Sequence, residues 1–217
     1  MTCCQCEGIE RLFDRRGAIQ ELHTYLRRGP ARTTRLLLDA LRAEGVEGAT
    51  LLDIGGGVGA IQLEMLVAGV RSATDVDASG AYLEIAREEA QRRGYGDRLT
   101  YRHGDLVELA QEIEPADIVT LDRVVCCYHN MPALVGASSA KARQLYGLVY
   151  PRDAWWVRLY SLVENAWFRM KHHPYRSFIH PARAVDAAVR SGGLERRYYR
   201  RGVFWQVVVY ARPMQLA

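Results

Sequence analysis

Short apolar runs alternate with longer amphipathic segments through most of this chain. The runs have the length of buried strands, and they occupy residues 50–54, 72–77, 99–105, 115–122 and 145–150. The segments between them carry apolar residues at helical spacing, over 34–44, 61–67 and 79–93. Strands that alternate with helices in this way predict a parallel sheet wound on both sides, with ligands bound at the carboxyl ends of its strands.

The pattern changes after residue 150. We predict a helix over 154–171 whose apolar residues, many of them aromatic, cover more than one face. A further helix over 182–190 and a hairpin of strands 194–200 and 203–212 follow. The expected fold is therefore α/β, with a doubly wound, mostly parallel seven-stranded sheet whose last strand is antiparallel.

Two parts of the chain are distinguished by composition. Residues 1–29 form a cysteine-rich lead-in, with a helix predicted over 8–25, and residues 30–217 form the main domain. Within that domain, residues 151–180 are predicted to be an aromatic-rich insertion. We expect the lead-in and the insertion to act as lids over a ligand pocket.

The first strand runs directly into a glycine-rich turn. Asp53 lies at the end of the strand, and Gly55, Gly57 and Gly59 precede the next helix. Glycine allows positive φ and a close approach of a ligand to the main chain, while the N–H groups of the helix point at that ligand. A nicotinamide or flavin dinucleotide requires a different glycine spacing, with its acid about 20 residues later. An acid inside the first strand instead suits a cationic ligand.

Further acids end the next strands along the chain. Because the carboxyl ends of parallel strands meet at one edge of a sheet, these acids and their neighbours are expected to contact the same ligand. The candidates are Asp77, Ala78, Asp105, Leu106 and Asp122. We expect Asp75 to face the opposite side of its strand from Asp77.

This series of glycines and strand-end acids resembles the motifs of the class I S-adenosylmethionine-dependent methyltransferases. The resemblance implies a Rossmann-like fold, S-adenosylmethionine as the cofactor, and methyl transfer as the activity. It also implies that the glycine loop and Asp53 hold the amino-acid end of the cofactor. By the same comparison, Asp77 would hold the ribose hydroxyls and Asp105 the adenine.

The segment after the fourth strand carries the candidate chemistry. His129 is the candidate general base, because its unperturbed pKa near 6.5 suits proton transfer close to neutrality. Tyr128 is a candidate to orient or deprotonate an acceptor hydroxyl. Cys126 and Cys127 cannot both face the pocket if the strand continues through them.

Substrate recognition is assigned to the lid elements. Arg152 is a candidate for binding a substrate carboxylate. Trp155 and Trp156, on the aromatic helix, are candidates for the wall of an acceptor pocket.

Within the methyltransferases, the chain is similar to the magnesium-protoporphyrin IX O-methyltransferases over residues 25–34, 121–128 and 178–202. The resemblance implies methylation of a small carboxylic or hydroxylic acceptor, most often on oxygen. Where that family carries a histidine-tyrosine pair, this chain aligns Cys126-Cys127 or Cys127-Tyr128, and the family's lead-in tyrosine falls at Phe13. These departures predict a small-molecule acceptor other than a porphyrin, with Phe13 beside it.

Composition and charge limit the possible partners and the cellular location. The net charge of +4, from 29 basic and 25 acidic residues, is no polybasic signature, and we expect no nucleic-acid partner. No apolar run approaches the roughly 20 residues of a membrane span, and the N-terminus lacks a signal-peptide core, so we expect a cytoplasmic protein. Five cysteines without secretory context indicate reduced thiols. The sequence leaves the oligomeric state open, a homodimer included.

Three alternatives remain at this stage. Thiols at Cys3, Cys4, Cys6, Cys126 and Cys127 would form a cluster suited to a soft metal, a metalloid or a sulfur acceptor if the lead-in folds over the pocket. No other spacing indicates a metal site. A non-catalytic module that binds the cofactor or a partner through the aromatic helix is the second alternative. A nicotinamide-dependent oxidoreductase is the third, and the positions of Asp53 and Asp105 argue against it.

Overall fold

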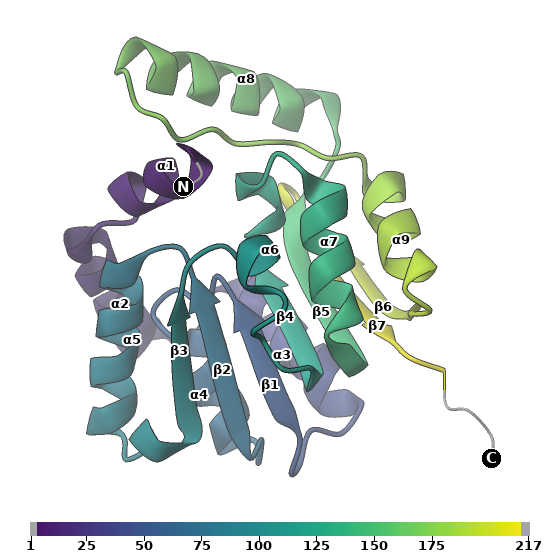
Figure 1. Cartoon of the computed structure of the whole chain (residues 1–217). Coiled ribbons are helices and arrows are strands. Elements are labelled where there is room, and N and C mark those ends of the chain that lie inside the picture. Colours follow the sequence, from purple (N-terminus) through teal and green to yellow (C-terminus); the bar gives the residue numbers. More distant parts are fainter. Residues whose placement is uncertain (1–3, 214–217) are drawn as a thin grey trace.

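A seven-stranded sheet forms the centre of the protein, in the order β3-β2-β1-β4-β5-β7-β6 (Figure 1). The computed structural model describes residues 4–213, with side chains from Glu7 onward. The strands are β1 (Thr50–Ile54), β2 (Ser72–Asp77), β3 (Leu99–His103), β4 (Ala116–Asp122), β5 (Ala142–Pro151), β6 (Glu195–Arg201) and β7 (Trp205–Ala211). β7 pairs antiparallel with both β5 and β6, while the other pairs are parallel. The predicted fold class is confirmed.

Helices cover both faces of the sheet, as the continuous apolar character of the strands requires. α3 (Arg32–Ala43), α4 (Ala60–Val67) and α5 (Gly80–Arg92) pack on one face, and α6 (Leu106–Leu109), α7 (Met131–Ala140) and α9 (Ala182–Ser191) on the other. Successive residues of a strand point to opposite faces. Leu51 accordingly packs in the first core and Leu52 in the second, and both are buried.

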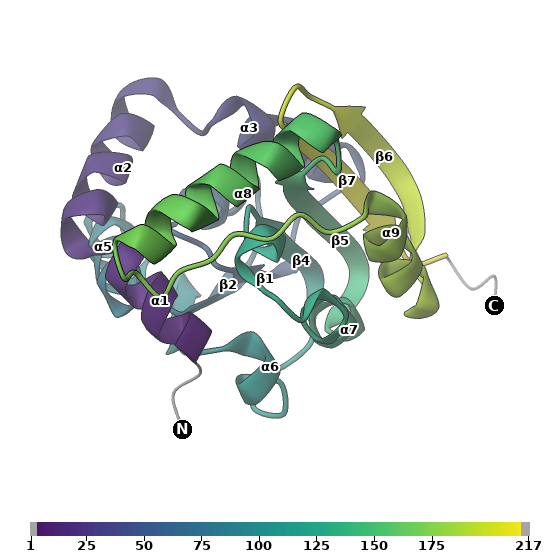
Figure 2. The same ribbon diagram turned by 90° about the horizontal axis from the view of Figure 1, so that it is seen from above.

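Three helices lie at the carboxyl end of the strands. α1 (Cys4–Leu12) and α8 (Trp155–Met170) cross above the sheet, and α2 (Arg15–Arg28) lies beside α5 (Figures 1 and 2). The prediction of a single lead-in helix over 8–25 is wrong, because α1 ends at Leu12 and a second helix begins at Arg15. The carboxylate of Asp14 caps this second helix, α2, by accepting from Gly17 N at 2.8 Å.

α1 packs closely on the segment that follows α8. A Cβ on Gly8 would lie 2.7 Å from the backbone nitrogen of Tyr175, so only glycine allows this approach. α1 and the segment after α8, which are distant in sequence, therefore contact each other above the sheet.

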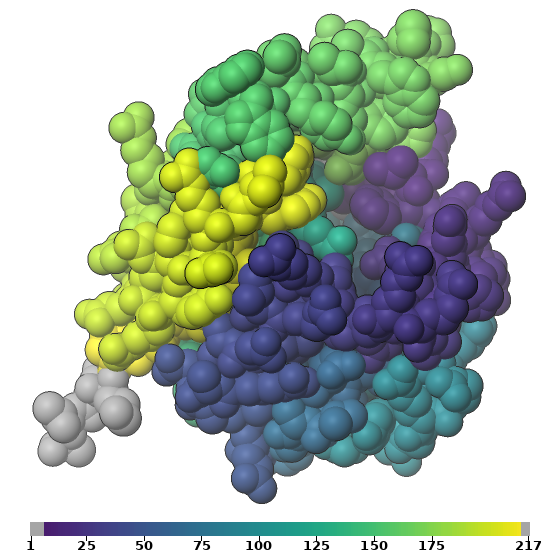
Figure 3. Space-filling model, turned by 180° about the vertical axis from the view of Figure 1, so that it is seen from behind, coloured from purple at the N-terminus to yellow at the C-terminus, as the bar shows by residue number. Residues whose placement is uncertain are grey.

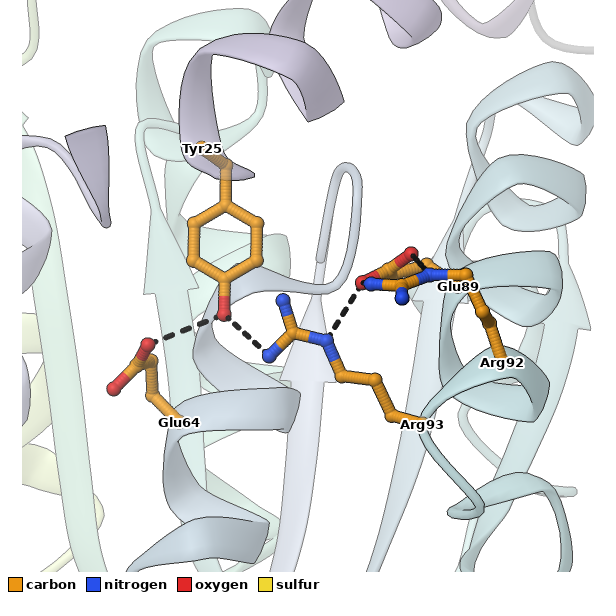
Figure 4. A network of polar contacts seen from close by, with 5 residues as sticks. All are labelled: Tyr25, Glu64, Glu89, Arg92 and Arg93. Atoms are coloured by element: carbon orange, nitrogen blue, oxygen red, sulfur yellow. Dashed lines mark hydrogen bonds and ion pairs between the residues drawn. The ribbon is translucent and has the colours of Figure 1, made fainter. Parts of the chain in front are cut away.

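A polar network fastens α2 to the rest of the domain (Figure 4). Tyr25 on α2 donates from its hydroxyl to Glu64 on α4 at 3.1 Å and accepts from Arg93, after α5, at 3.4 Å. Arg93 and Arg92 also pair with Glu89 on α5, each at 2.6 Å. These contacts join α2 to the main domain. The predicted boundary between the lead-in and the main domain at residue 29 stays a prediction.

Candidate functional site

A cavity of about 640 Å³ opens at the carboxyl end of the sheet. In the space-filling view from behind, the molecule is hollowed between the yellow β6–β7 hairpin, the green α8 and the purple N-terminal helices (Figure 3). Its walls come from the glycine loop, the ends of β1, β2 and β4, and helices α1, α2 and α3. This is the edge at which a doubly wound sheet binds ligands.

The glycine loop between β1 and α4 requires its glycines. Gly55, Gly57 and Gly59 have φ of 64°, 60° and 82°, which side chains rarely adopt. A Cβ on Gly55 would in addition lie 2.4 Å from Val124. Gly55 and Gly57 line the cavity, whereas Gly59 lies just outside it as the N-cap of α4.

Asp77 places a carboxylate at the cavity wall. It ends β2, is 9% exposed, and accepts hydrogen bonds from Gly57 N at 3.2 Å and Ser79 N at 2.8 Å. Burial raises the pKa of Asp77 to about 6, and the two backbone donors oppose that rise. The adjacent Ala78 also lines the cavity. Asp77 therefore both fixes the glycine loop and offers an acceptor to a ligand.

Asp53 lies beneath the glycine loop and is not part of the cavity wall. It is fully buried, and it accepts from the hydroxyl of Thr120 at 2.6 Å and from the amide of Gln62 at 3.2 Å. Burial raises its pKa to about 7. Any contribution of Asp53 to a ligand site in this structure acts through the loop above it.

Asp75 joins Asp53 beneath the same loop. The expectation that it faces away from Asp77 is wrong, because residues two apart on a strand share a face. Asp75 pairs in register with Asp53, and burial raises its pKa well above the ordinary value. Within residues 4–213, neither carboxylate oxygen of Asp75 has a hydrogen-bond partner. A Cβ on Gly56 would meet Gln62, Asp75 and Asp53 together, so the loop rests on this cluster.

Replacing Asp75 by asparagine is expected to stabilise the protein more at about pH 8 than at about pH 5. An acid with a raised folded-state pKa keeps its proton where the unfolded chain has lost it, so its contribution to stability falls as pH rises toward the folded pKa. Asparagine does not titrate, and it removes that loss. Urea denaturation at both pH values measures the difference, with Asp39→Asn on the exposed side of α3 as the control. Parallel stability curves for wild type and variant would contradict the assignment.

Asp105 and Asp122 are the other two acids that line the cavity at the strand ends. Asp105 caps α6 through Val107 N at 2.8 Å and accepts from the Tyr128 hydroxyl at 2.8 Å. Asp122 accepts from the hydroxyl of Thr34 at 2.5 Å and pairs with Arg123 at 3.2 Å. All of these except Val107 line the cavity, together with Leu106.

Some of the predicted catalytic and substrate residues line the cavity, and others lie outside it. His129 is exposed outside the cavity, stacked on the ring of Tyr128 with centroids 5.7 Å apart. Arg152 donates to the carbonyls of Gly202 and Val203, away from the cavity.

The two tryptophans also lie outside the cavity lining. Trp155 is 76% exposed, and Trp156 packs edge-on against Phe204. Phe13, by contrast, lines the cavity, in edge contact with Tyr82 and Tyr175 at centroid distances of 5.6 and 6.3 Å.

Two thiols lie side by side in the cavity wall. β4 ends at Asp122, and the 3-10 turn Val125–Cys127 directs both Cys126 and Cys127 to the cavity, with their sulfurs 4.0 Å apart. Cys127 Sγ lies 3.2 Å from the Tyr175 hydroxyl. Hydrogen bonding with Cys126 and Tyr175 lowers the pKa of Cys127 against the effect of burial, while the pKa of Cys126 is raised.

The predicted thiol cluster also includes three cysteines near the N-terminus. Cys3 lies outside the described residues, and the side chains of Cys4 and Cys6 on α1 are likewise outside them. In the described part of the chain, no group of three or more His, Cys, Asp or Glu side chains is arranged to hold a metal ion.

Three arginines at one side of the cavity were not singled out from the sequence. Arg28, at the end of α2, and Arg32 and Arg35, in the first turn of α3, all line it. They are exposed, and none forms an ion pair with another described residue. In the sequence, their positions on either side of Gly29-Pro30 were the only sign that they could lie together. The turn between α2 and α3 brings all three to the wall of the cavity.

The comparisons with known proteins agree with this architecture. Residues 51–145 match a family described as a methyltransferase domain. The ribosomal protein L11 methyltransferase of Alteromonas mediterranea is 30% identical over 146 residues, which cover 64% of this chain and 49% of that protein. A ubiquinone/menaquinone biosynthesis C-methyltransferase of Allorhizobium ampelinum is 32% identical over 87 residues, 39% of this chain and 34% of that protein. The chain thus spans about half, or less, of these curated relatives.

The fold is that of the class I methyltransferases, and the matched residues 51–145 include the glycine loop and the acids at the ends of β1 to β4. Over almost its whole length the chain is similar to the magnesium protoporphyrin IX methyltransferase of Synechocystis PCC 6803, solved with bound S-adenosylhomocysteine. That structure has a TM-score of 0.74 and 17% identity, and the match covers 96% of this chain and 100% of that one. The predicted methyltransferase fold is confirmed, and the comparisons agree with the predicted class and cofactor.

Proposed function

We propose that this protein transfers a methyl group from S-adenosylmethionine to a small-molecule acceptor, with oxygen as the acceptor atom. The observation that carries the proposal is the cavity itself. Its volume of about 640 Å³ falls in the range of small-molecule sites and must hold the cofactor and the acceptor together, and α1 and the segment after α8 line part of its wall. A macromolecular acceptor, such as the ribosomal protein named for the curated relatives, would need a more open approach.

The residues present fit the cofactor. Gly57 leaves space beside the main chain, since a Cβ there would have no neighbour closer than 3.8 Å, and the ligand can approach the loop. Asp77 would offer its buried carboxylate to the ribose hydroxyls, and Asp105 with Leu106 would hold the adenine. Asp53 positions the loop from below. When bound, the cofactor supplies a methyl group made electrophilic by the attached sulfonium.

The chain must then orient the acceptor and remove a proton from it. We assign the proton acceptor to Cys127 in place of His129, because the thiol lines the cavity and its pKa is lowered by its neighbours. The Tyr175 hydroxyl orients the Cys127 sulfur at 3.2 Å. Phe13 and Trp205 supply an apolar wall, and Arg28, Arg32 and Arg35 would attract an anionic group at the other end of the acceptor.

A second candidate follows from the thiol pair. Two sulfurs 4.0 Å apart in a cavity wall suit a soft acceptor, such as a metalloid or a thiol compound. In that case, Cys126 and Cys127 would bind the acceptor itself instead of accepting its proton.

Calorimetry followed by a transfer assay tests the proposal. We expect S-adenosylmethionine and S-adenosylhomocysteine to bind with micromolar affinity, and labelled methyl to appear on hydroxyl- or carboxyl-bearing acceptors, with anionic acceptors preferred over their neutral amides. Cys127→Ser should lower kcat on hydroxyl acceptors, whose proton must be removed, while cofactor affinity is retained. Transfer only to trivalent arsenic or thiols, lost in Cys126→Ser, would favour the second candidate. Failure to bind either cofactor form would overturn both.

A further inference from the structure

The outer face of α8 is the most apolar exposed surface among the described residues. Val157, Ser161 and Phe168 are its buried positions and define the inner face. Large apolar side chains occupy the opposite side, and each is at least half exposed. They are Trp155, Leu159, Tyr160, Leu162, Val163, Trp167 and Met170. Isolated exposed apolar residues are ordinary, but a contiguous set on one helix marks an interaction surface.

The charges of α8 are segregated. Glu164, its only acid, lies toward the inner side and accepts from the Ser177 hydroxyl at 2.7 Å. Arg158 and Arg169 are exposed, and neither pairs with another described residue; Lys171 follows at the end of the helix. The outer face therefore presents apolar side chains bordered by cations, without an exposed acid.

The turn between β6 and β7 extends this surface. Phe204 packs edge-on against Trp156 and Tyr160, with centroids 5.9 and 5.5 Å away. Its neighbour Val203 is 79% exposed. Viewed from the side and from above, α8 is the outermost element over the strand ends (Figures 1 and 2).

We propose that α8 and Val203 form a docking surface that lies in the headgroup layer of an anionic lipid bilayer. Helices with one apolar, tryptophan-bearing face and cationic borders bind in the plane of such an interface. The cations complement anionic headgroups, and no exposed acid on the face opposes them. The helix lies on the bilayer and does not cross it, since no described helix is long and apolar enough to span a membrane.

A second copy of the chain fits this surface less well. A two-fold contact between two α8 helices would bring their cationic borders together with no acid on the face to pair with them. Charge thus favours the bilayer over self-association. The inference does not depend on the methyl acceptor or on catalysis.

Vesicle sedimentation of the full chain tests the proposal. We expect strong binding to vesicles of mixed phosphatidylcholine and phosphatidylglycerol and weak binding to phosphatidylcholine alone, with a blue shift of tryptophan emission on binding. Leu162→Glu combined with Met170→Glu should weaken binding to the mixed vesicles at least tenfold. Arg158→Gln with Arg169→Gln should reduce it toward the level seen on phosphatidylcholine. The matched control is Val67→Glu, which changes a comparably exposed residue at the far end of α4.

Circular dichroism and cofactor titration establish that each variant is folded. Absence of binding to either vesicle would overturn the proposal, as would an equal loss in Val67→Glu. A concentration-dependent dimer that Leu162→Glu abolishes, without vesicle binding, would assign the surface to a second copy instead.

Discussion

Gly56→Ala is expected to abolish measurable cofactor binding and to lower the free energy of unfolding by about 3 kcal/mol. The added Cβ would lie 2.2 Å from Gln62 Nε2, 2.6 Å from Asp75 Oδ1 and 2.9 Å from Asp53 Oδ2. All three side chains are fully buried, so none can move aside into solvent. Either the glycine loop is displaced into the cavity or the carboxylate cluster is forced apart. Calorimetry and urea denaturation on the same sample measure both effects.

Gly136→Ala is the matched control for this substitution. Gly136 lies in α7, and a Cβ there has no neighbour within 4 Å. Alanine is favoured over glycine in a helix, so a gain of about 0.5–1 kcal/mol is expected, with cofactor affinity unchanged. Wild-type affinity in Gly56→Ala would show that the loop does not rest on the acidic cluster in the way described.

Asp77→Ala is expected to weaken binding of S-adenosylmethionine by one to two orders of magnitude, corresponding to about 1–3 kcal/mol for lost hydrogen bonds to a charged group. The substitution removes an acceptor from the cavity and frees the Gly57 and Ser79 N–H groups that Asp77 holds. Asp77→Asn keeps an oxygen acceptor and should show a smaller loss. Titration calorimetry provides the measurement, with Asp39→Ala on the exposed surface of α3 as the control.

The pH dependence of binding gives the same residue a second test. Burial raises the pKa of Asp77 to about 6, so in the free protein the carboxylate is ionised above that pH and protonated below it. Hydrogen bonds to hydroxyls favour the ionised form, and affinity should therefore fall as pH decreases through about 6. In Asp77→Asn that part of the pH dependence should disappear. Unchanged affinity in Asp77→Ala at neutral pH would refute the role.

The fold could be predicted because its signals are local. The strands 50–54 and 72–77 have the predicted bounds, and the other predicted strands differ from the observed ones by a few residues at their ends. Alternation of side chains and the positive φ of the loop glycines depend on neighbouring residues alone. The short helix α6 and the weakly amphipathic α7 were not predicted, because their apolar residues follow no clear helical period.

The candidate site was predictable only where it is built from strand ends. Asp77, Asp105 and Asp122 reach the cavity because parallel strands end at one edge, which the sequence alone indicates. His129 and the two cysteines follow β4, where the direction of each side chain depends on the conformation of a turn. The 3-10 turn at Val125–Cys127 directs both thiols inward and leaves His129 outside. No periodicity in the sequence encodes that turn.

The doubly wound sheet, the glycine loop and the acids at the strand ends follow from the amino-acid sequence alone, since their signals lie among near neighbours. The surroundings of these features depend on tertiary packing. It placed Asp53 and Asp75 beneath the loop, brought Tyr175 from the segment after α8 to Cys127, and left the apolar face of α8 exposed. Those positions depend on packing between segments distant in sequence, and the chain order carries no local signal for such packing.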